Sequence, residues 1–296
     1  MTRPFAFAML LVASTAAAQE STPPPAAVRF GREPAVAPVV EPVVVPFELM
    51  ANRPVVRVTI NGQGPFPLLL GPEEQQTQID PELAELLKLK LPEPGLPPLT
   101  VDVVFSPKYT AKMEIAIQPL TRVAPEFPPA MRPRGVISLA AWRDMLVTLD
   151  YSRWKISIEP GALPEANRKD VFDLNAAGEL RLPLSLGGEA IDCHVDPWFP
   201  NALLVPTTML GEGQLAGEPR DQGMMKTKET ALRVREGRLL ADPVLGPFEV
   251  KTPLILLADT IESATVGTPW LARYAVTYDL AHGRVRLGRP SKEQGR

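Results

Sequence analysis

Short runs of alternating apolar and polar residues, bounded by turn residues, recur along the chain from about residue 46 onward. Val56, Val58 and Ile60 alternate with polar residues and lead into Asn61-Gly62. Alternation with a period of two residues is typical of a strand with one buried face, and Asn-Gly is a strong short-range hairpin signal. The pattern predicts a β-hairpin here and an all-β fold class for the folded part of the chain.

The same pattern occurs a second time much later in the chain. Leu182 to Leu186 alternates leucine with other residues and leads into Gly187-Gly188, 126 residues after the first pattern. An apolar strand follows the turn in both places, Leu68 to Leu70 in the first and Cys193 to Val195 in the second, now 125 residues apart. A change of one residue in the hairpin loop explains the difference.

The clearest internal match lies further along the two patterns. GVISLAAWRDMLVTLDYSRWKISI (residues 135–158) aligns without a gap with ATVGTPWLARYAVTYDLAHGRVRL (residues 264–287), at an offset of 129. Three segments in the same order indicate an internal duplication of roughly 120 residues per copy, near the usual size of a domain. We therefore expect two similar lobes, at residues 46–165 and 166–290, and a tail at 291–296.

Helix signals are few. Asp80-Pro81-Glu82 combines an N-cap residue, a proline at the first helical position and an acidic first turn, so it predicts a helix. A second short helix is expected from Leu139 to Asp144. The 35 prolines among 296 residues are about twice the usual share of ~5%, which argues against long helices.

The N-terminus predicts export. Met1-Thr2-Arg3 is followed by an apolar stretch from Phe5 to Ala13 and by small residues ending at Ala18. This is the pattern of a signal peptide at residues 1–18, and it predicts a periplasmic or secreted protein. Residues 19–45 are rich in Pro, Ala and Val and predict an extended linker whose last residues could join a sheet edge.

Composition and hydropathy argue against a membrane-spanning protein and against a nucleic-acid-binding protein. No later apolar run approaches the ~20 residues of a membrane-spanning helix, so we expect no membrane span. A formal net charge of -3 gives no indication of nucleic acid binding. The only cysteine, Cys193, excludes a disulfide within the chain.

The order of segments in each copy resembles the bilobal aspartic proteases, which are pepsin-like in plan and retropepsin-like in each lobe, and especially their exported bacterial members. The resemblance covers about residues 46–290. It implies two pseudo-symmetric lobes of mostly antiparallel sheet, a central cleft and short helices. In that family an Asp-Thr-Gly loop follows the apolar strand of each lobe. Here Gly71-Pro72-Glu73 stands at the first loop and Asp196-Pro197-Trp198 at the second.

This departure removes one of the two catalytic aspartates. In the family, two carboxylates about 3 Å apart share one proton, so that one acts as base while the other polarises the peptide carbonyl. Gly71 takes the position of the lost aspartate and Asp196 is left as a remnant. The resemblance then implies an inactive pseudo-protease with a peptide or protein ligand in its cleft. The alternative is an active acid peptidase that pairs Asp196 with Glu73 or Glu74.

Two further ambiguities concern the second loop. Asp196 could face the cleft as a lone acid, or it could cap a turn before Pro197, which is ordinary turn chemistry. Trp198 and Phe199 stand where the family has small residues, so they could fill the catalytic cavity or form a stacking surface for a bound peptide.

The strand that leads into the second loop offers a candidate metal site. Asp192, His194 and Asp196 alternate along it and so share one face, which could hold a divalent cation. With only two histidines in the chain, a structural role is favoured. The sequence therefore predicts no metal and no cofactor.

Overall fold

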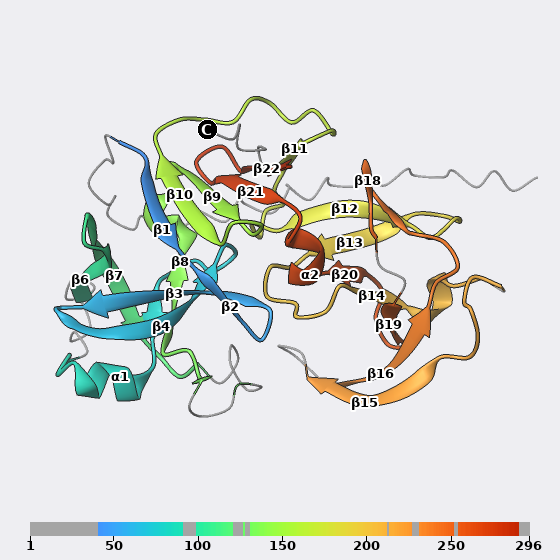
Figure 1. Cartoon of the computed structure of the whole chain (residues 1–296), viewed down its shortest axis with the longest axis horizontal. Coiled ribbons are helices and arrows are strands. Elements are labelled where there is room, and N and C mark those ends of the chain that lie inside the picture. The colour runs from blue at the N-terminus through green and yellow to red at the C-terminus, as the bar shows by residue number, and fades with distance from the viewer. Residues whose placement is uncertain are drawn as a thin grey trace, which may run out of the picture.

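The computed structural model describes residues 41–90, 99–120, 127, 131–211, 213–226, 231–251 and 254–289. The predicted signal peptide, the linker up to residue 40 and the tail from residue 291 lie outside the described residues. Within them the chain is all-β, with strands in three sheets and only short helices, so the predicted fold class is confirmed. Figure 1 shows two lobes side by side, with the third sheet spanning both.

The first lobe is a seven-stranded sheet in the order β2-β3-β4-β8-β5-β7-β6. The hairpin predicted at Asn61-Gly62 joins β3 to β4, and both turn residues have positive φ, 49° and 79°, as a type I′ turn requires. The strands of this sheet are β2 (Glu48–Met50), β3 (Arg53–Ile60), β4 (Gln63–Gly71), β5 (Gln78–Ile79), β6 (Leu99–Ser106), β7 (Tyr109–Ile117) and β8 (Gly135–Ser138).

The predicted first helix is α1 (Pro81–Leu86), and its cap is the one that the sequence indicated. The Leu83 backbone N–H donates a hydrogen bond of 2.6 Å to Oδ1 of Asp80. The second predicted helix is shorter than expected, a 3-10 helix η2 (Leu139–Trp142), whose first turn is capped by the Ser138 hydroxyl.

The second lobe is a nine-stranded sheet in the order β15-β16-β19-β14-β20-β13-β12-β17-β18. A short 3-10 helix, η3 (Thr207–Met209), follows β14, and α2 (Thr268–Leu271) follows β20. The strands are β12 (Leu180–Ser185), β13 (Ile191–Val195), β14 (Leu203–Pro206), β15 (Arg220–Lys226), β16 (Ala231–Arg238), β17 (Val244–Leu245), β18 (Phe248–Glu249), β19 (Leu254–Ala258) and β20 (Ala264–Val266).

The two lobes share an order of strand pairing. The series β3-β4-β8-β5-β7-β6 alternates antiparallel and parallel neighbours, and the series β12-β13-β20-β14-β19-β16 repeats the same alternation. The register agrees as well, because Leu70 lies opposite Ile137 and Val195 lies opposite Val266. These positions are related by the offsets found in the sequence, which supports the duplication.

The third sheet joins the lobes in the order β1-β10-β9-β21-β22-β11. At its centre β9 pairs with β21 in antiparallel fashion, with Thr148 opposite Thr277 and their hydroxyl oxygens 2.9 Å apart. The two threonines are equivalent positions of the internal match. The strands are β1 (Val43–Pro46), β9 (Leu146–Asp150), β10 (Lys155–Glu159), β11 (Val171–Asp173), β21 (Ala275–Asp279) and β22 (Arg284–Gly288).

The last residues of the predicted linker join a sheet edge, as the sequence allowed. Residues 43–45 belong to β1, which pairs with β10 along the edge of the third sheet. Val45 is buried in the main core, so this strand contributes to the fold before Pro46. The same core runs through both lobes, so the fold is one continuous packed body.

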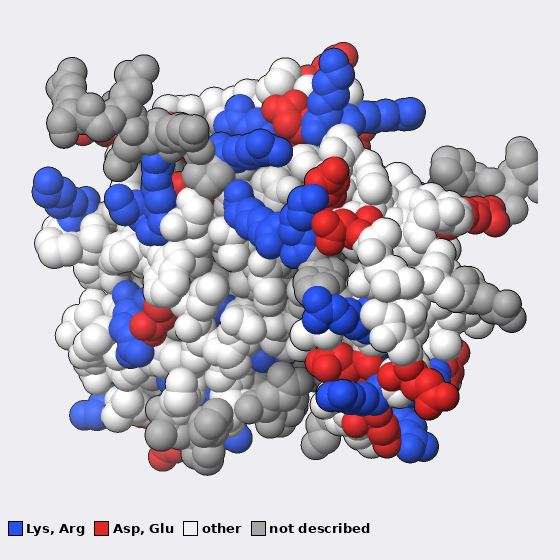
Figure 2. Space-filling model, turned by 45° about the vertical axis from the view of Figure 1, so that its right-hand side comes forward, with Lys and Arg blue, Asp and Glu red and all other residues white. Residues whose placement is uncertain are grey.

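Two surface properties complete the description. No helix among the described residues has the length and apolar character needed to cross a membrane. Figure 2 shows acidic and basic side chains intermixed on the face in view. Among the exposed ion pairs is Arg233–Asp221, with 2.8 Å between Nη2 and Oδ2.

Candidate functional site

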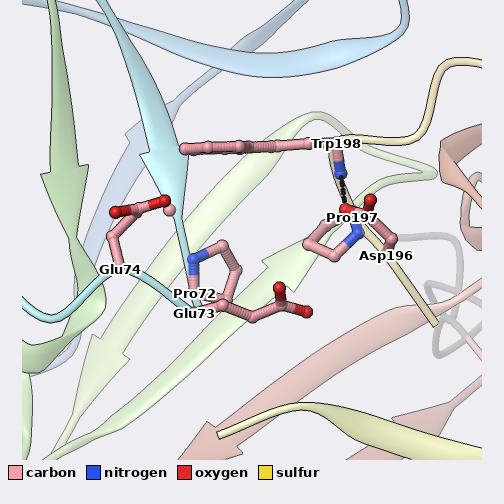
Figure 3. A pocket seen from close by; sticks show the side chains of 7 residues that line it. Pro72, Glu73, Glu74, Asp196, Pro197 and Trp198 are labelled. Atoms are coloured by element: carbon pink, nitrogen blue, oxygen red, sulfur yellow. Dashed lines mark hydrogen bonds between the residues drawn. The ribbon is translucent and has the colours of Figure 1, made fainter. Parts of the chain in front are cut away.

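The loops after β4 and β13 meet at the boundary between the lobes. They line one pocket, to which the first loop contributes residues 71–74 and the second contributes residues 196–198 (Figure 3). Its volume is about 170 Å³ including the open mouth, below the roughly 300–1,000 Å³ usual for ligand sites. The pocket itself is therefore small for a substrate.

Asp196 takes part in a turn. Its backbone N–H donates to the Val266 carbonyl at 2.9 Å, and its Oδ1 accepts a 2.7 Å hydrogen bond from the Trp198 backbone N–H. This is the contact that the turn interpretation requires. Among the described residues, the Asp196 carboxylate makes no hydrogen bond to a second carboxyl group.

Gly71 leaves little room for the aspartate that the family has there. A Cβ atom at this position would lie 2.6 Å from Cγ of Glu74 and 2.8 Å from Cγ1 of Val136. The Glu74 backbone is held by the Ser138 hydroxyl, which donates to its carbonyl at 2.5 Å. Figure 3 shows the Glu74 carboxylate on the side of the pocket away from Asp196.

Trp198 spans the lobe boundary. Its indole N–H donates a 2.6 Å hydrogen bond to the carbonyl of Leu70, the residue before Gly71. Its own carbonyl accepts a 2.8 Å hydrogen bond from Nε of Arg53. The ring packs against an apolar cluster of the first lobe formed by Met50, Val55, Leu69, Leu120, Phe127 and Val136. Figure 3 shows the indole lying over the pocket, which is the arrangement of a plug.

Phe199 points the other way. It is 8% exposed and packs in the second lobe with Leu204, Leu232 and Val234. The interpretation of two adjacent aromatics as one stacking surface therefore needs a correction. Phe199 is a core residue and offers no surface to a ligand, because it turns into the second lobe while Trp198 turns toward the first.

Glu73 contacts the second lobe through a histidine. Its Oε1 lies 2.7 Å from Nε2 of His194 in β13, and both side chains are mostly buried, with exposed fractions of 19% and 16%. Burial lowers the pKa of the His194 imidazole. The hydrogen bond to Glu73 and the surrounding carboxylates outweigh burial, so the pKa of His194 is raised above its ordinary value of 6.5. The contact therefore favours the charged imidazolium, which pairs with Glu73 across the lobe boundary.

Glu179 completes a cluster with these two residues. One oxygen of each carboxylate and one nitrogen of His194 all lie within 4.8 Å of one another. Glu179 is held in place by Nδ2 of Asn175 and by Nε of Arg181, each at 2.9 Å. Of the three residues considered for a metal from the sequence, only His194 belongs here. Asp192 is instead paired with the Arg181 guanidinium.

The negative charges of Glu73 and Asp196 in the two loops act on two buried tyrosines. Tyr151 is 1% exposed, and its hydroxyl has no hydrogen-bond partner among the described residues. Burial and the negative charges of Asp196 and Glu73 raise the pKa of Tyr151, and the pKa of Tyr278 is raised in the same way. The sequence pattern gave no signal for either residue, because tyrosine in a strand is expected from packing alone.

A scan of family models found no match, and a search of curated proteins found none either. Solved structures do match. One of them is basic 7S globulin from soybean, with 12% sequence identity and a TM-score of 0.47 over 84% of this chain and 95% of the other.

Proposed function

We propose that this chain is an aspartic-protease-like module without peptidase activity, which binds an extended peptide or protein segment between its lobes. The family resemblance rests on the motifs in the sequence. It is supported by the repeated order of strand pairing and by the meeting of the two equivalent loops at the lobe boundary. On this proposal residues 1–18 direct export, and the module acts in the periplasm or outside the cell.

One observation carries the inactive assignment. The Trp198 indole donates to the Leu70 carbonyl directly beside Gly71 and lies over the pocket between the two loops (Figure 3), where a paired-carboxylate mechanism would need a second acid and a bound water. A single carboxylate cannot act as base and acid at once. Asp196 is in addition engaged by its own turn.

The alternative is an acid peptidase that uses Asp196 with a replacement acid. Glu74 is disfavoured because its carboxylate lies away from Asp196 (Figure 3). Glu73 is disfavoured because its carboxylate is paired with His194 at 2.7 Å. The inactive module is therefore preferred.

The surface that we propose for the peptide is a second, larger cavity next to the loops. Its volume is about 410 Å³ including the open mouth. Residues from both lobes line it, including Gln75 and Arg143 from the first and Leu174 and Asn175 from the second. Apolar and polar groups converge there, as peptide recognition requires.

The test uses fluorescent peptides from a denatured protein digest and follows binding to the purified chain by anisotropy. Gln75→Trp places a bulky ring into the cavity from an exposed position, so we expect at least about tenfold weaker binding. Gln63→Trp, at the exposed start of β4, is the matched control and should bind as wild type. Recovered peptides should be intact by mass spectrometry. Absence of binding, or equal binding by both variants, would contradict the proposal.

A further inference from the structure

The Glu73, His194 and Glu179 cluster combines one imidazole nitrogen with two carboxylates. Zinc is bound in proteins by this set of donors, and imidazole favours it over the hard cations Mg²⁺ and Ca²⁺. The three side chains have exposed fractions of 19%, 16% and 24%, so the cluster is partly shielded from water. Partial shielding strengthens the attraction between a divalent ion and its ligands.

Glu179 is already oriented by its neighbours. Asn175 and Arg181 both donate to Oε2 of Glu179. Outer contacts of this kind fix the direction of a ligand's donor atoms and are a regular part of zinc sites. The positive charge of Arg181 is matched by Asp192, which it also contacts, so the cluster keeps a net negative charge.

A second observation concerns a buried hydroxyl on which the charge of Glu73 acts. The Tyr151 hydroxyl is buried without a hydrogen-bond partner among the described residues, and Glu73 is one of the two charges that act on it. Buried polar groups in proteins are nearly always satisfied by protein or by an ordered water. An ordered water near Glu73 would satisfy this hydroxyl, and an ion bound there would bring one with it.

We propose that Glu73, His194 and Glu179 form a zinc site that links the two lobes. Glu73 follows β4 of the first lobe, whereas His194 lies in β13 and Glu179 precedes β12 of the second. In a tetrahedral site with bonds of about 2.1 Å, ligand atoms are about 3.4 Å apart. Glu73 and His194, now 2.7 Å apart, would separate slightly, and the three donor atoms, which now lie within 4.8 Å of one another, would draw in around the ion.

The site requires only three protein ligands, so a water completes the tetrahedron. Because the ligands come from both lobes, the ion would stabilise the folded chain against separation of the lobes. The proposal does not depend on peptide binding, since a chain that binds no peptide could still bind zinc. The two failures are therefore distinguishable.

The experiment is isothermal titration calorimetry of the full chain, purified without a histidine tag and freed of metal with a chelator. Zn²⁺ is the probe and Mg²⁺ the control ion. The chain has two histidines, which gives a matched pair of variants. His194→Ala removes the proposed ligand, and His282→Ala removes the other histidine, which pairs with Asp279. Glu179→Gln keeps the shape of its side chain and guards against a folding defect in His194→Ala.

We expect one equivalent of Zn²⁺ to bind to wild type and to His282→Ala, with no heat from Mg²⁺. Affinity should fall by at least about tenfold in Glu179→Gln and in His194→Ala. Zn²⁺ should also raise the thermal unfolding midpoint of wild type and of His282→Ala, but not that of His194→Ala. Zinc binding that survives in both ligand variants, or no zinc heat with the folded wild-type chain, would overturn the assignment.

Discussion

Trp198 offers the sharpest test of how the lobe boundary is held. Trp198→Phe keeps an aromatic ring but removes the indole N–H that donates to the Leu70 carbonyl at 2.6 Å. Leaving a largely buried acceptor without its donor costs about 1–3 kcal/mol. Trp198→Ala also removes the packing against the apolar cluster of the first lobe. Full loss of a buried Trp costs about 3–5 kcal/mol, and because Trp198 is only partly buried we expect about 3 kcal/mol.

The assay is equilibrium unfolding in urea followed by far-UV circular dichroism, which does not depend on the tryptophan that is removed. A lower midpoint at unchanged slope reports a loss of stability. Trp154→Phe is the matched control, because Trp154 is 52% exposed and a surface change should stay within about 0.5 kcal/mol. Equal midpoints for Trp198→Phe and Trp154→Phe would refute the bridging role of the indole.

Three further predictions follow from the described contacts. First, in the presence of chelator, the Glu73–His194 pair should contribute fully to folding stability below pH 6.5, and this contribution should be lost as pH rises through the raised pKa of His194. Glu73→Gln should therefore flatten the fall of the thermal unfolding midpoint between pH 6 and 9. An unchanged profile in this variant would contradict the prediction. Gly267→Ala should cost at least about 2 kcal/mol, because its Cβ would lie 2.1 Å from the Phe199 carbonyl oxygen, and a neutral effect in urea would count against the packing described. Thr148→Val breaks the threonine pair of the third sheet and should lower stability by about 0.5–1.5 kcal/mol, whereas a stabilised variant would show that the pair contributes nothing.

Much of the local structure could be predicted from the sequence. The hairpin at Asn61-Gly62 and the cap at Asp80 depend on neighbouring residues only, so local patterns were sufficient. The repeated order of strand pairing was likewise predictable, because the two series of strands keep similar spacing along the sequence. These features are set by short-range conformational preferences and by the period of the strands.

The contents of the site could not be predicted in the same way. Glu73 and His194 are 121 residues apart, and their contact exists only because the lobes pack together. Trp198 and Phe199 are neighbours of similar chemistry, yet one packs on the first lobe and the other in the second. Which way each ring turns is decided by the space that each lobe leaves, and sequence spacing carries no information on that.

The most direct test of the inactive assignment is a cleavage assay with the purified chain and a denatured protein between about pH 3 and 7, where a carboxylate pair would work. Asp196→Ala and a pepstatin-type inhibitor are the controls. We expect no more cleavage from the wild-type chain than from Asp196→Ala at any pH. Cleavage that the inhibitor blocks and that Asp196→Ala abolishes would contradict the account.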